Sequence, residues 1–226
     1  MKVGGAMKEG GKIMKKPTNL RLILLAMIFL QSCIVISQNL KGFSPRFDRR
    51  LKGDMLLIGN NILNRDTDER DPEDAYDRGG YNSDFDMRYI DIDGDPNTFS
   101  SSSATLKIPK PACYKIVHAG LYWGAILQRD SRTGIEDVML KLPKGGYNKI
   151  KGEIVYDAAA APIGSDNNKA YACYADITDL VAGQADAQGE YTVANVLSSQ
   201  GSNGGTGLSA GWSIFIVYED PTLPAK

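Results

Sequence analysis

The residues of this sequence that are best suited to chemistry are acidic. Asp91, Asp93 and Asp95 alternate within a short run that also holds Gly94. Alternate positions of a strand point to one side of it, so three carboxylates would converge at a strand end. Carboxylate oxygens beside a glycine turn are ligands that calcium takes, and the run therefore predicts a calcium site. Further ligands would come from the preceding acidic segment, with Asp66, Asp68, Asp84 and Asp86 as weaker candidates.

This acidic run also has an interpretation without a metal. Its spacing is not that of an EF-hand, because Gly94 falls at the fourth position and Ser102 occupies the place of the bidentate glutamate. Aspartates of this kind also close turns and protect the edge of a strand from pairing with another chain. Both interpretations stay open, and no other cofactor is indicated.

A serine-hydrolase pattern, G-x-S-x-G, surrounds Ser209, but its context is wrong for catalysis. The motif needs a strand-to-helix turn and a histidine later in the chain. A glycine-rich run precedes Ser209 and a strand-like run follows it, while the only histidine, His118, lies far upstream. His118 itself sits within an apolar run, which favours a buried residue over a metal ligand. We therefore expect no enzyme activity.

Tyr122 and Trp123 stand between Leu121 and Gly124 and offer aromatic rings to a ligand. Such rings form stacking platforms for sugars, but beside a glycine at a strand end they more often pack in a core. Core packing is the favoured interpretation, and ligand binding by this pair is the alternative.

Two cysteines, Cys113 and Cys173, lie in apolar strand-like runs of the same local sequence, Ala-Cys-Tyr. In an oxidising compartment they would form a disulfide, which stabilises by about 4 kcal/mol for a loop of this size. Buried free thiols are an equally good expectation, because spacing alone does not show whether the two side chains face each other.

The N-terminal residues resemble a secretory signal. Basic residues precede an uncharged apolar run over residues 22–30, which is shorter than the roughly 20 residues that a membrane span needs. Small residues then suggest cleavage after Ser37, so residues 1–37 are expected to be a signal peptide, with Met14 as a better start than Met1. The alternatives are an uncleaved anchor and a lipoprotein acylated at Cys33.

The rest of the chain is predicted to be all-β. After a solvated basic leader over residues 38–53, a β-sandwich or jelly-roll domain is expected over 54–226, with one short helix over 177–181 and a long acidic loop over 66–86. Strands are expected at 55–58, 87–92, 104–108, 113–123, 135–142, 154–156, 170–174, 191–197 and 212–218. The last of these is apolar on both faces, which is typical of a central strand. It ends close to Lys226, so we expect the domain to be truncated there and to continue in a longer protein.

Several stretches together resemble the N-terminal β-domain of large type IX-secreted surface proteins of gliding bacteria, which are related to gliding-motility adhesins. These stretches are spread over nearly the whole length of the mature chain and are residues 55–66, 84–93 with Asp95, Thr98, Phe99 and 101–104, 119–125, 174–181, 191–196, 210–213 and 217–221. The resemblance implies a β-sandwich module without known catalysis at the head of a longer exported protein. It implies no ligand-binding residue.

The formal net charge of −1 gives no electrostatic reason to expect nucleic acid as a partner. We expect a non-catalytic, secreted or cell-surface module of adhesin type, with no transmembrane span in the mature chain. Its expected partners are the export machinery and surface glycans or other surface proteins. The alternative function is a carbohydrate-binding or accessory module of a secreted hydrolase, suggested by Tyr122, Trp123 and the aspartates.

Overall fold

The computed structural model divides the chain into two units, Met1–Leu40 and Lys41–Lys226. It describes residue 1 and residues 44–65, 81–109, 113–129, 131–160, 169–202 and 207–226. Apart from Met1, all of these residues belong to the second unit. Apart from Met1, the expected signal peptide, including Cys33, lies outside the described residues.

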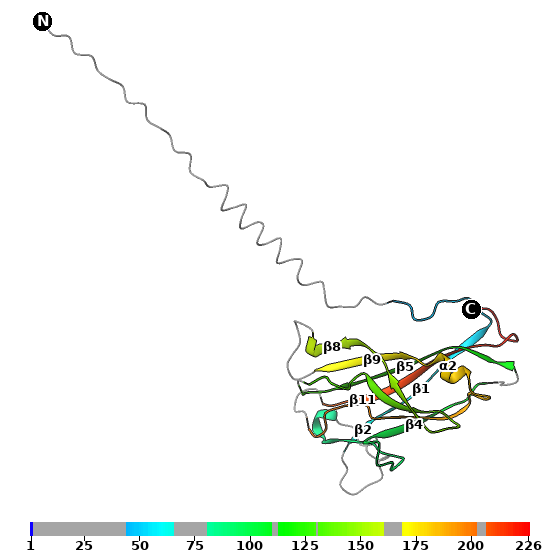
Figure 1. The fold of residues 1–226 in the computed structure, drawn as a ribbon, viewed down its shortest axis with the longest axis horizontal. Coiled ribbons are helices and arrows are strands. Elements are labelled where there is room, and N and C mark those ends of the chain that lie inside the picture. The colour runs from blue at the N-terminus through cyan, green and yellow to red at the C-terminus, as the bar shows by residue number, and fades with distance from the viewer. Residues whose placement is uncertain (2–43, 66–80, 110–112, 130, 161–168, 203–206) are drawn as a thin grey trace. The chain divides into compact units, whose positions relative to one another are not determined.

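The second unit is an all-β sandwich, as the sequence predicted (Figure 1). A five-stranded antiparallel sheet has the order β1-β11-β5-β9-β8, formed by β1 (Gly53–Asn61), β11 (Ala210–Glu219), β5 (Lys115–Ile126), β9 (Ala170–Asp176) and β8 (Glu153–Asp157). A four-stranded antiparallel sheet has the order β4-β10-β6-β7, formed by β4 (Ser101–Leu106), β10 (Gly189–Ala194), β6 (Asp137–Lys141) and β7 (Tyr147–Lys151).

Smaller elements join these sheets. A short ladder pairs β2 (Leu63–Arg65) with β3 (Met87–Tyr89), and two 3-10 turns, η3 (Asn82–Asp84) and η5 (Ala158–Ala160), lie in the connections. The expected helix is present as α2 (Thr178–Ala182), and Asp176 Oδ1 accepts a 2.9 Å hydrogen bond from the Thr178 N–H at its start. The sequence did not predict β2 or β7.

The core forms between the two sheets because their strands alternate buried and outward side chains. In β11, the inward side chains include Trp212, Ile214 and Ile216, all at most 5 % exposed. The indole Nε1–H of Trp212 donates a 2.8 Å hydrogen bond to Ser102 Oγ in β4 and so joins the two sheets through a buried polar contact. Buried donors must find partners of this kind if the sandwich is to be stable.

The position of β11 corrects the reason for expecting a missing strand. β11 is central in its sheet, as predicted, but its neighbours are β1 and β5, which both lie upstream in the sequence. Hence no strand beyond Lys226 is needed to complete its pairing. Its outward positions are also less buried than expected, because Ser213 and Phe215 are only partly covered.

The structure has no disulfide between Cys113 and Cys173, and both are free thiols. Cys113 precedes β5 and is exposed, whereas Cys173 is buried in β9 opposite Trp123. At about 3.3 Å per residue, the strand from Lys115 to Trp123 alone covers about 26 Å, and a disulfide needs Cα atoms within about 7 Å. The structure therefore agrees with the free-thiol interpretation and not with the disulfide, although only Cys173 is buried.

Candidate functional site

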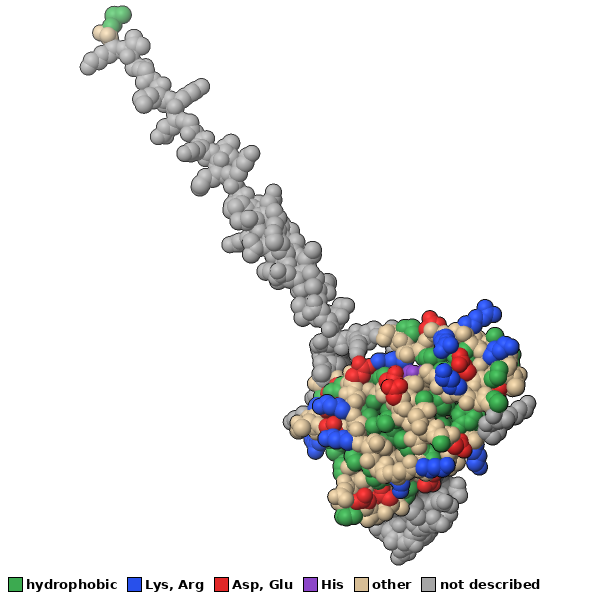
Figure 2. Space-filling model, turned by 45° about the vertical axis from the view of Figure 1, so that its right-hand side comes forward, with side chains coloured by type: hydrophobic (Ala, Val, Ile, Leu, Met, Phe, Trp, Pro, Cys, Tyr) green, Lys and Arg blue, Asp and Glu red, His purple; other side chains and the backbone are tan. Residues whose placement is uncertain are grey.

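The outer face of the five-stranded sheet is the face turned away from the core. In β5 it carries His118, Gly120, Tyr122 and Gly124, because alternate residues of a strand point the same way. Figure 2 shows hydrophobic side chains gathered across the middle of one face of the domain, with basic and acidic side chains toward its rim.

The N-terminal residues of the second unit lie against this outer face. We call residues 44–52 the strap. The Phe47 ring stacks on the His118 ring with centroids 5.3 Å apart and an interplanar angle of 20°. The Arg46 guanidinium lies 4.3 Å from the centroid of the Tyr174 ring and forms an ion pair with Glu153. The expectation of a solvated leader is therefore wrong for Arg46 and Phe47, whose side chains pack on the sheet, whereas Asp48 and Arg50 are exposed.

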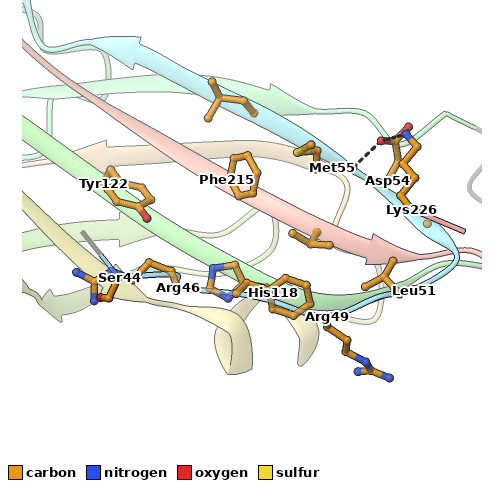
Figure 3. A pocket seen from close by; sticks show the side chains of 14 residues that line it. Ser44, Arg46, Arg49, Leu51, Asp54, Met55, His118, Tyr122, Phe215 and Lys226 are labelled. Atoms are coloured by element: carbon orange, nitrogen blue, oxygen red, sulfur yellow. Dashed lines mark hydrogen bonds and ion pairs between the residues drawn. The ribbon is translucent and has the colours of Figure 1, made fainter. Parts of the chain in front are cut away.

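Between the strap and β1 the outer face holds a hollow of about 630 Å³, which we call the apolar groove (Figure 3). Tyr122, Phe215 and Met55 project into it from β5, β11 and β1. Its remaining lining comes from the strap and the adjacent strands and consists of Ser44, Arg46, Phe47, Arg49, Leu51, Gly53, Asp54, Leu57, His118, Val217 and Lys226.

The charged groups at the edge of this groove are already paired. Lys226 Nζ lies 2.6 Å from Asp54 Oδ1, and this hydrogen bond holds the pKa of Asp54 below its usual value. Arg49 Nη2 lies 3.1 Å from Glu219 Oε1. The groove therefore presents a mainly apolar surface whose rim carries ion pairs rather than excess charge.

Two large apolar side chains of β1 that line the groove are exposed to solvent. Met55 is 57 % exposed and Leu57 is 66 % exposed, on an edge strand of the sheet. Neighbouring apolar side chains exposed along one strand mark a surface that binds another molecule more often than scattered ones do.

A second hollow, of about 620 Å³, lies on the same outer face next to the groove. We call it the glycine trough, because three of its lining residues are Gly59, Gly124 and Gly211. A Cβ added at Gly124 would lie 2.5 Å from the carbonyl oxygen of Tyr171, so this position requires glycine for the close approach of β9. The other lining residues are Asn60, Asn61, Tyr122, Trp123, Ala172, Trp212 and Ser213.

Tyr122 borders both the apolar groove and the glycine trough. Its ring lies 4.9 Å from the Tyr174 ring, and both rings cover Gly120, where a Cβ would meet Tyr174 at 2.8 Å. Trp123 has the opposite orientation. It is 2 % exposed, and its Nε1–H donates a 2.8 Å hydrogen bond to the Ile135 carbonyl oxygen. The sequence-based pairing of Tyr122 with Trp123 as ligand-binding residues was therefore wrong for Trp123, whose side chain belongs to the core.

The acidic run forms a turn at the start of the connection to β4. Asp91 Oδ1 accepts a 2.8 Å hydrogen bond from Ser101 Oγ–H. Asp93 Oδ1 accepts hydrogen bonds from the Asp95 N–H and from Thr98 Oγ–H, both 3.0 Å long, and Asp93 Oδ2 accepts one from the Tyr147 hydroxyl. Burial raises the pKa of Asp93, but these hydrogen bonds outweigh it and lower the pKa to about 2.

Of the remaining aspartates of the calcium hypothesis, the structure describes Asp84 and Asp86, and these two do not join the turn. Asp84 Oδ2 accepts a 2.9 Å hydrogen bond from the Tyr81 N–H at the start of η3. Asp86 is exposed immediately before β3, and Asp66 and Asp68 lie outside the described residues. Across the described part of the chain, no three His, Cys, Asp or Glu side chains come together in a way that could hold a metal ion. The calcium site stays a prediction.

Ser209 and His118 lie at opposite ends of β5. The Ile126 N–H donates a hydrogen bond to the Ser209 carbonyl oxygen, and His118 is eight residues back along the same strand. The strand covers about 26 Å over that length, whereas a serine nucleophile and its base must lie within about 3.2 Å. His118 therefore cannot activate Ser209.

The sequence pointed to Tyr122 but missed the residues that surround it. Met55 and Leu57 were expected only as part of a strand over residues 55–58, and neither they nor Gly59 and Asn60 were expected to line a binding site. The sequence carries no signal for this, because residues 55–58 are all apolar and residues 59–61 are all small or polar, so no alternation marks a covered and an uncovered face.

Comparison with known proteins found no match to this chain among family models, curated proteins or solved structures. Within the residues that the structure describes, none of the helices has the length and apolar character of a membrane span.

Proposed function

We propose that this chain is a non-catalytic, adhesin-type binding module of an exported cell-surface protein, and that the outer face of its five-stranded sheet is the binding surface. The observation that carries the proposal is the open apolar groove, in whose lining Met55 and Leu57 are exposed to solvent. Burying one large apolar side chain against a partner contributes about 1.5–3 kcal/mol to binding. Because Met55 and Leu57 are both exposed, a partner that covered them would gain this free energy from each.

The chemistry of the domain supports binding over catalysis. The single histidine of the chain is covered by Phe47, and the serine of the G-x-S-x-G pattern lies at the far end of β5 from it. Neither residue is placed for nucleophilic or acid–base chemistry.

Export is supported by the apolar run over residues 22–30 and by the small residues before Gln38. The resemblance to type IX-secreted surface proteins of gliding bacteria supports a proposed role of the module in cell adhesion during gliding motility. Its proposed partners are the export machinery and glycans or proteins of the contacted surface.

The binding surface is tested by Leu57→Asp in the full chain, displayed by its native cells. A carboxylate in the groove rim loses the apolar contact and adds a desolvation cost, so attachment should fall at least about tenfold, which corresponds to about 1.4 kcal/mol. Ile92→Asp is the matched control, because Ile92 is 54 % exposed in the acidic turn, away from the groove. Unchanged attachment of Leu57→Asp cells, with the protein at normal levels on the surface, would reject the proposal.

Export has its own test. Deletion of residues 14–37 should leave the protein in the cytoplasm, where fractionation and immunoblotting would find it. Surface display that survives this deletion would refute the role given to the leader.

A further inference from the structure

β1 lies at one edge of the five-stranded sheet, and half of its backbone groups face away from that sheet. Residues of an antiparallel strand alternate between those that hydrogen-bond to the neighbouring strand and those that turn away from it. The Ile62 N–H donates to the Ala210 carbonyl oxygen, in register with the β1–β11 ladder. At the other end the Asp220 N–H donates to the Lys52 carbonyl oxygen. Even-numbered residues therefore pair with β11, and odd-numbered residues from 53 to 61 direct their N–H and C=O groups to the open edge.

This odd-numbered row already takes part in backbone pairing at one end. Leu51 belongs to the same row, and its N–H donates to the Lys226 carbonyl oxygen at 3.4 Å, while the Lys226 N–H donates to the Leu51 carbonyl oxygen at 3.0 Å. Farther along the row, no partner across this edge is found among the described residues for the backbone groups of Leu57 and Gly59. The edge can thus accept another strand, and it is open around Leu57.

The side chains of β1 give this edge little protection against such pairing. Natural sheets protect their edges with charged residues and with irregular strands. The edge strand β7 carries Lys149 and Lys151, and the edge strand β8 begins and ends with an acidic residue and has a register shift in its pairing with β9. In contrast, β1 has 9 residues with one charge, on Asp54, and an unbroken apolar run over residues 55–58. β1 is therefore suited to pairing with a further apolar strand.

The sequence of β1 fits a second copy of itself. When two antiparallel strands pair through their open rows, odd-numbered residues of one must face odd-numbered residues of the other. Leu57 is the middle residue of Gly53–Asn61, so a two-fold axis at this position sets Leu57 opposite Leu57 of the second copy. The remaining pairs are then Met55 with Gly59, Leu56 with Ile58 and Asp54 with Asn60. In this register apolar residues face apolar or small ones, and the one carboxylate faces a neutral amide.

We infer that the protein self-associates through β1, with two copies pairing antiparallel about Leu57 so that their five-stranded sheets form one continuous sheet. Such a dimer has the two-fold symmetry that is commonest among oligomers of identical chains. Pairing covers Leu56 and Ile58, which are only half-buried, and Leu57, which is 66 % exposed. The outer faces of the two copies point to the same side of the continuous sheet. The inference goes beyond the proposed function, because the partner is a second copy and not a molecule of the contacted surface.

One contact at this edge also fits a monomer. Asp54 Oδ1 accepts a 2.9 Å hydrogen bond from the Met55 N–H, and a side chain that bonds an edge N–H replaces a partner strand at that point. In the dimer the Gly59 carbonyl oxygen of the second copy takes the place of this carboxylate oxygen. Because Leu57 has no such contact among the described residues, an experiment on strand pairing must act at Leu57.

The test places charges on the two-fold axis. Leu57→Lys and Leu57→Glu each set like charges opposite each other, so the dissociation constant of the dimer should rise at least about tenfold. An equimolar mixture of the two variants sets opposite charges there and should restore association. Sedimentation velocity measures this from micromolar to millimolar concentration on the chain from Gln38 to Lys226, which contains the whole second unit. Ile154→Lys is the matched control, because Ile154 is 42 % exposed on β8, the other edge strand of the sheet.

Each result either supports the β1 dimer or overturns it. A parent chain that stays monomeric at every concentration overturns it, and so does a dimer that Leu57→Lys leaves intact or that Ile154→Lys weakens equally. A mixture that associates no better than either charge variant alone overturns the pairing about Leu57. Circular dichroism spectra that match the parent show that the variants are folded.

Failure of the dimer can be distinguished from failure of the proposed function. If Leu57→Asp lowers cell attachment while the purified parent is monomeric, the outer face is still the binding surface and only the dimer fails. If the mixture of charge variants dimerises while Leu57→Asp cells attach normally, the dimer stands and the proposed binding surface is rejected.

Discussion

Tyr122 and Trp123 are consecutive residues of β5, yet Tyr122 lies half-buried on the outer face and Trp123 lies 2 % exposed in the core. The two rings thus serve different purposes. Trp123 fills the space between the sheets and satisfies the Ile135 carbonyl oxygen, whereas Tyr122 separates the apolar groove from the glycine trough.

This difference predicts opposite effects of the two alanine substitutions. Trp123→Ala removes a buried indole and leaves a cavity, so the free energy of unfolding should fall by about 3–5 kcal/mol. Tyr122→Ala should lower it by only about 1 kcal/mol, because its ring is partly in water already. Urea unfolding followed by circular dichroism measures both. Equal losses would mean that Tyr122 is a core residue and not a surface one.

The two free thiols should differ in reactivity. Burial raises the pKa of the Cys173 thiol to about 12, while Cys113 is exposed. Since the thiolate is the reactive form, a disulfide reagent should modify Cys113 in the folded chain from Gln38 and spare Cys173 until the protein unfolds. Mass spectrometry after labelling at pH 8 checks this. Cys113→Ser should abolish the rapid labelling of the folded chain. Rapid labelling that survives this change would mean that Cys113 is not the reactive thiol.

The architecture was predictable because successive side chains of a strand point to opposite faces, so a strand with one buried face alternates apolar and polar residues. In the strand expected over residues 104–108, Leu106 and Ile108 alternate with Thr105 and Lys107, and both are buried. The long apolar run of β11 likewise predicted a central strand, which β11 is. The turn residues between these segments marked the ends of the strands closely enough for a β-sandwich to be predicted.

The candidate site was less predictable because tertiary contacts create it. Nothing local distinguishes Phe47 in a basic leader from a solvated residue, and only the folded sheet brings His118 beneath it. The trough depends on register, since Gly124 and Gly211 become neighbours only when β5 and β11 pair. A periodic pattern shows which side of a strand is apolar, but it does not show which other strands will lie beside it.

The strap should be held to the sheet chiefly by its aromatic contact. Phe47→Ala removes the stack on His118, which is worth about 1 kcal/mol, and should raise local opening about fivefold. Limited trypsin digestion after Arg46 and Arg49 should speed up by a similar factor, because those bonds are cleaved from the opened segment. Asp48→Ala is the control, since Asp48 is exposed. Equal digestion rates for the parent and Phe47→Ala would place the holding contacts elsewhere, with the Arg46–Glu153 pair as the next candidate.

Arg132 connects three chain segments through a largely buried ion pair. Its Nε lies 3.0 Å and 3.1 Å from the two carboxylate oxygens of Asp157, and its Nη atoms donate to the carbonyl oxygens of Leu127 and Lys169. Burial raises the pKa of Asp157, but the hydrogen bonds from Arg132 outweigh this effect and hold it below its usual value. A carboxyl with a lowered folded-state pKa stabilises the fold above its unfolded pKa of about 3.9, and this contribution is lost as the pH falls.

Arg132→Met should therefore destabilise the domain in a pH-dependent way. At pH 6 the loss should be about 2 kcal/mol, because Asp157 stays charged and largely buried without its partner. Below about pH 4 the gap should narrow, since protonation weakens the pair in the parent and relieves the buried charge in the variant. Urea unfolding from pH 6 to pH 2 measures the gap. Lys151→Met is the control, because Lys151 forms an exposed pair with Glu136 and should change the free energy of unfolding by less than about 0.5 kcal/mol. A gap that is the same at every pH would mean that Arg132 stabilises the domain by packing alone.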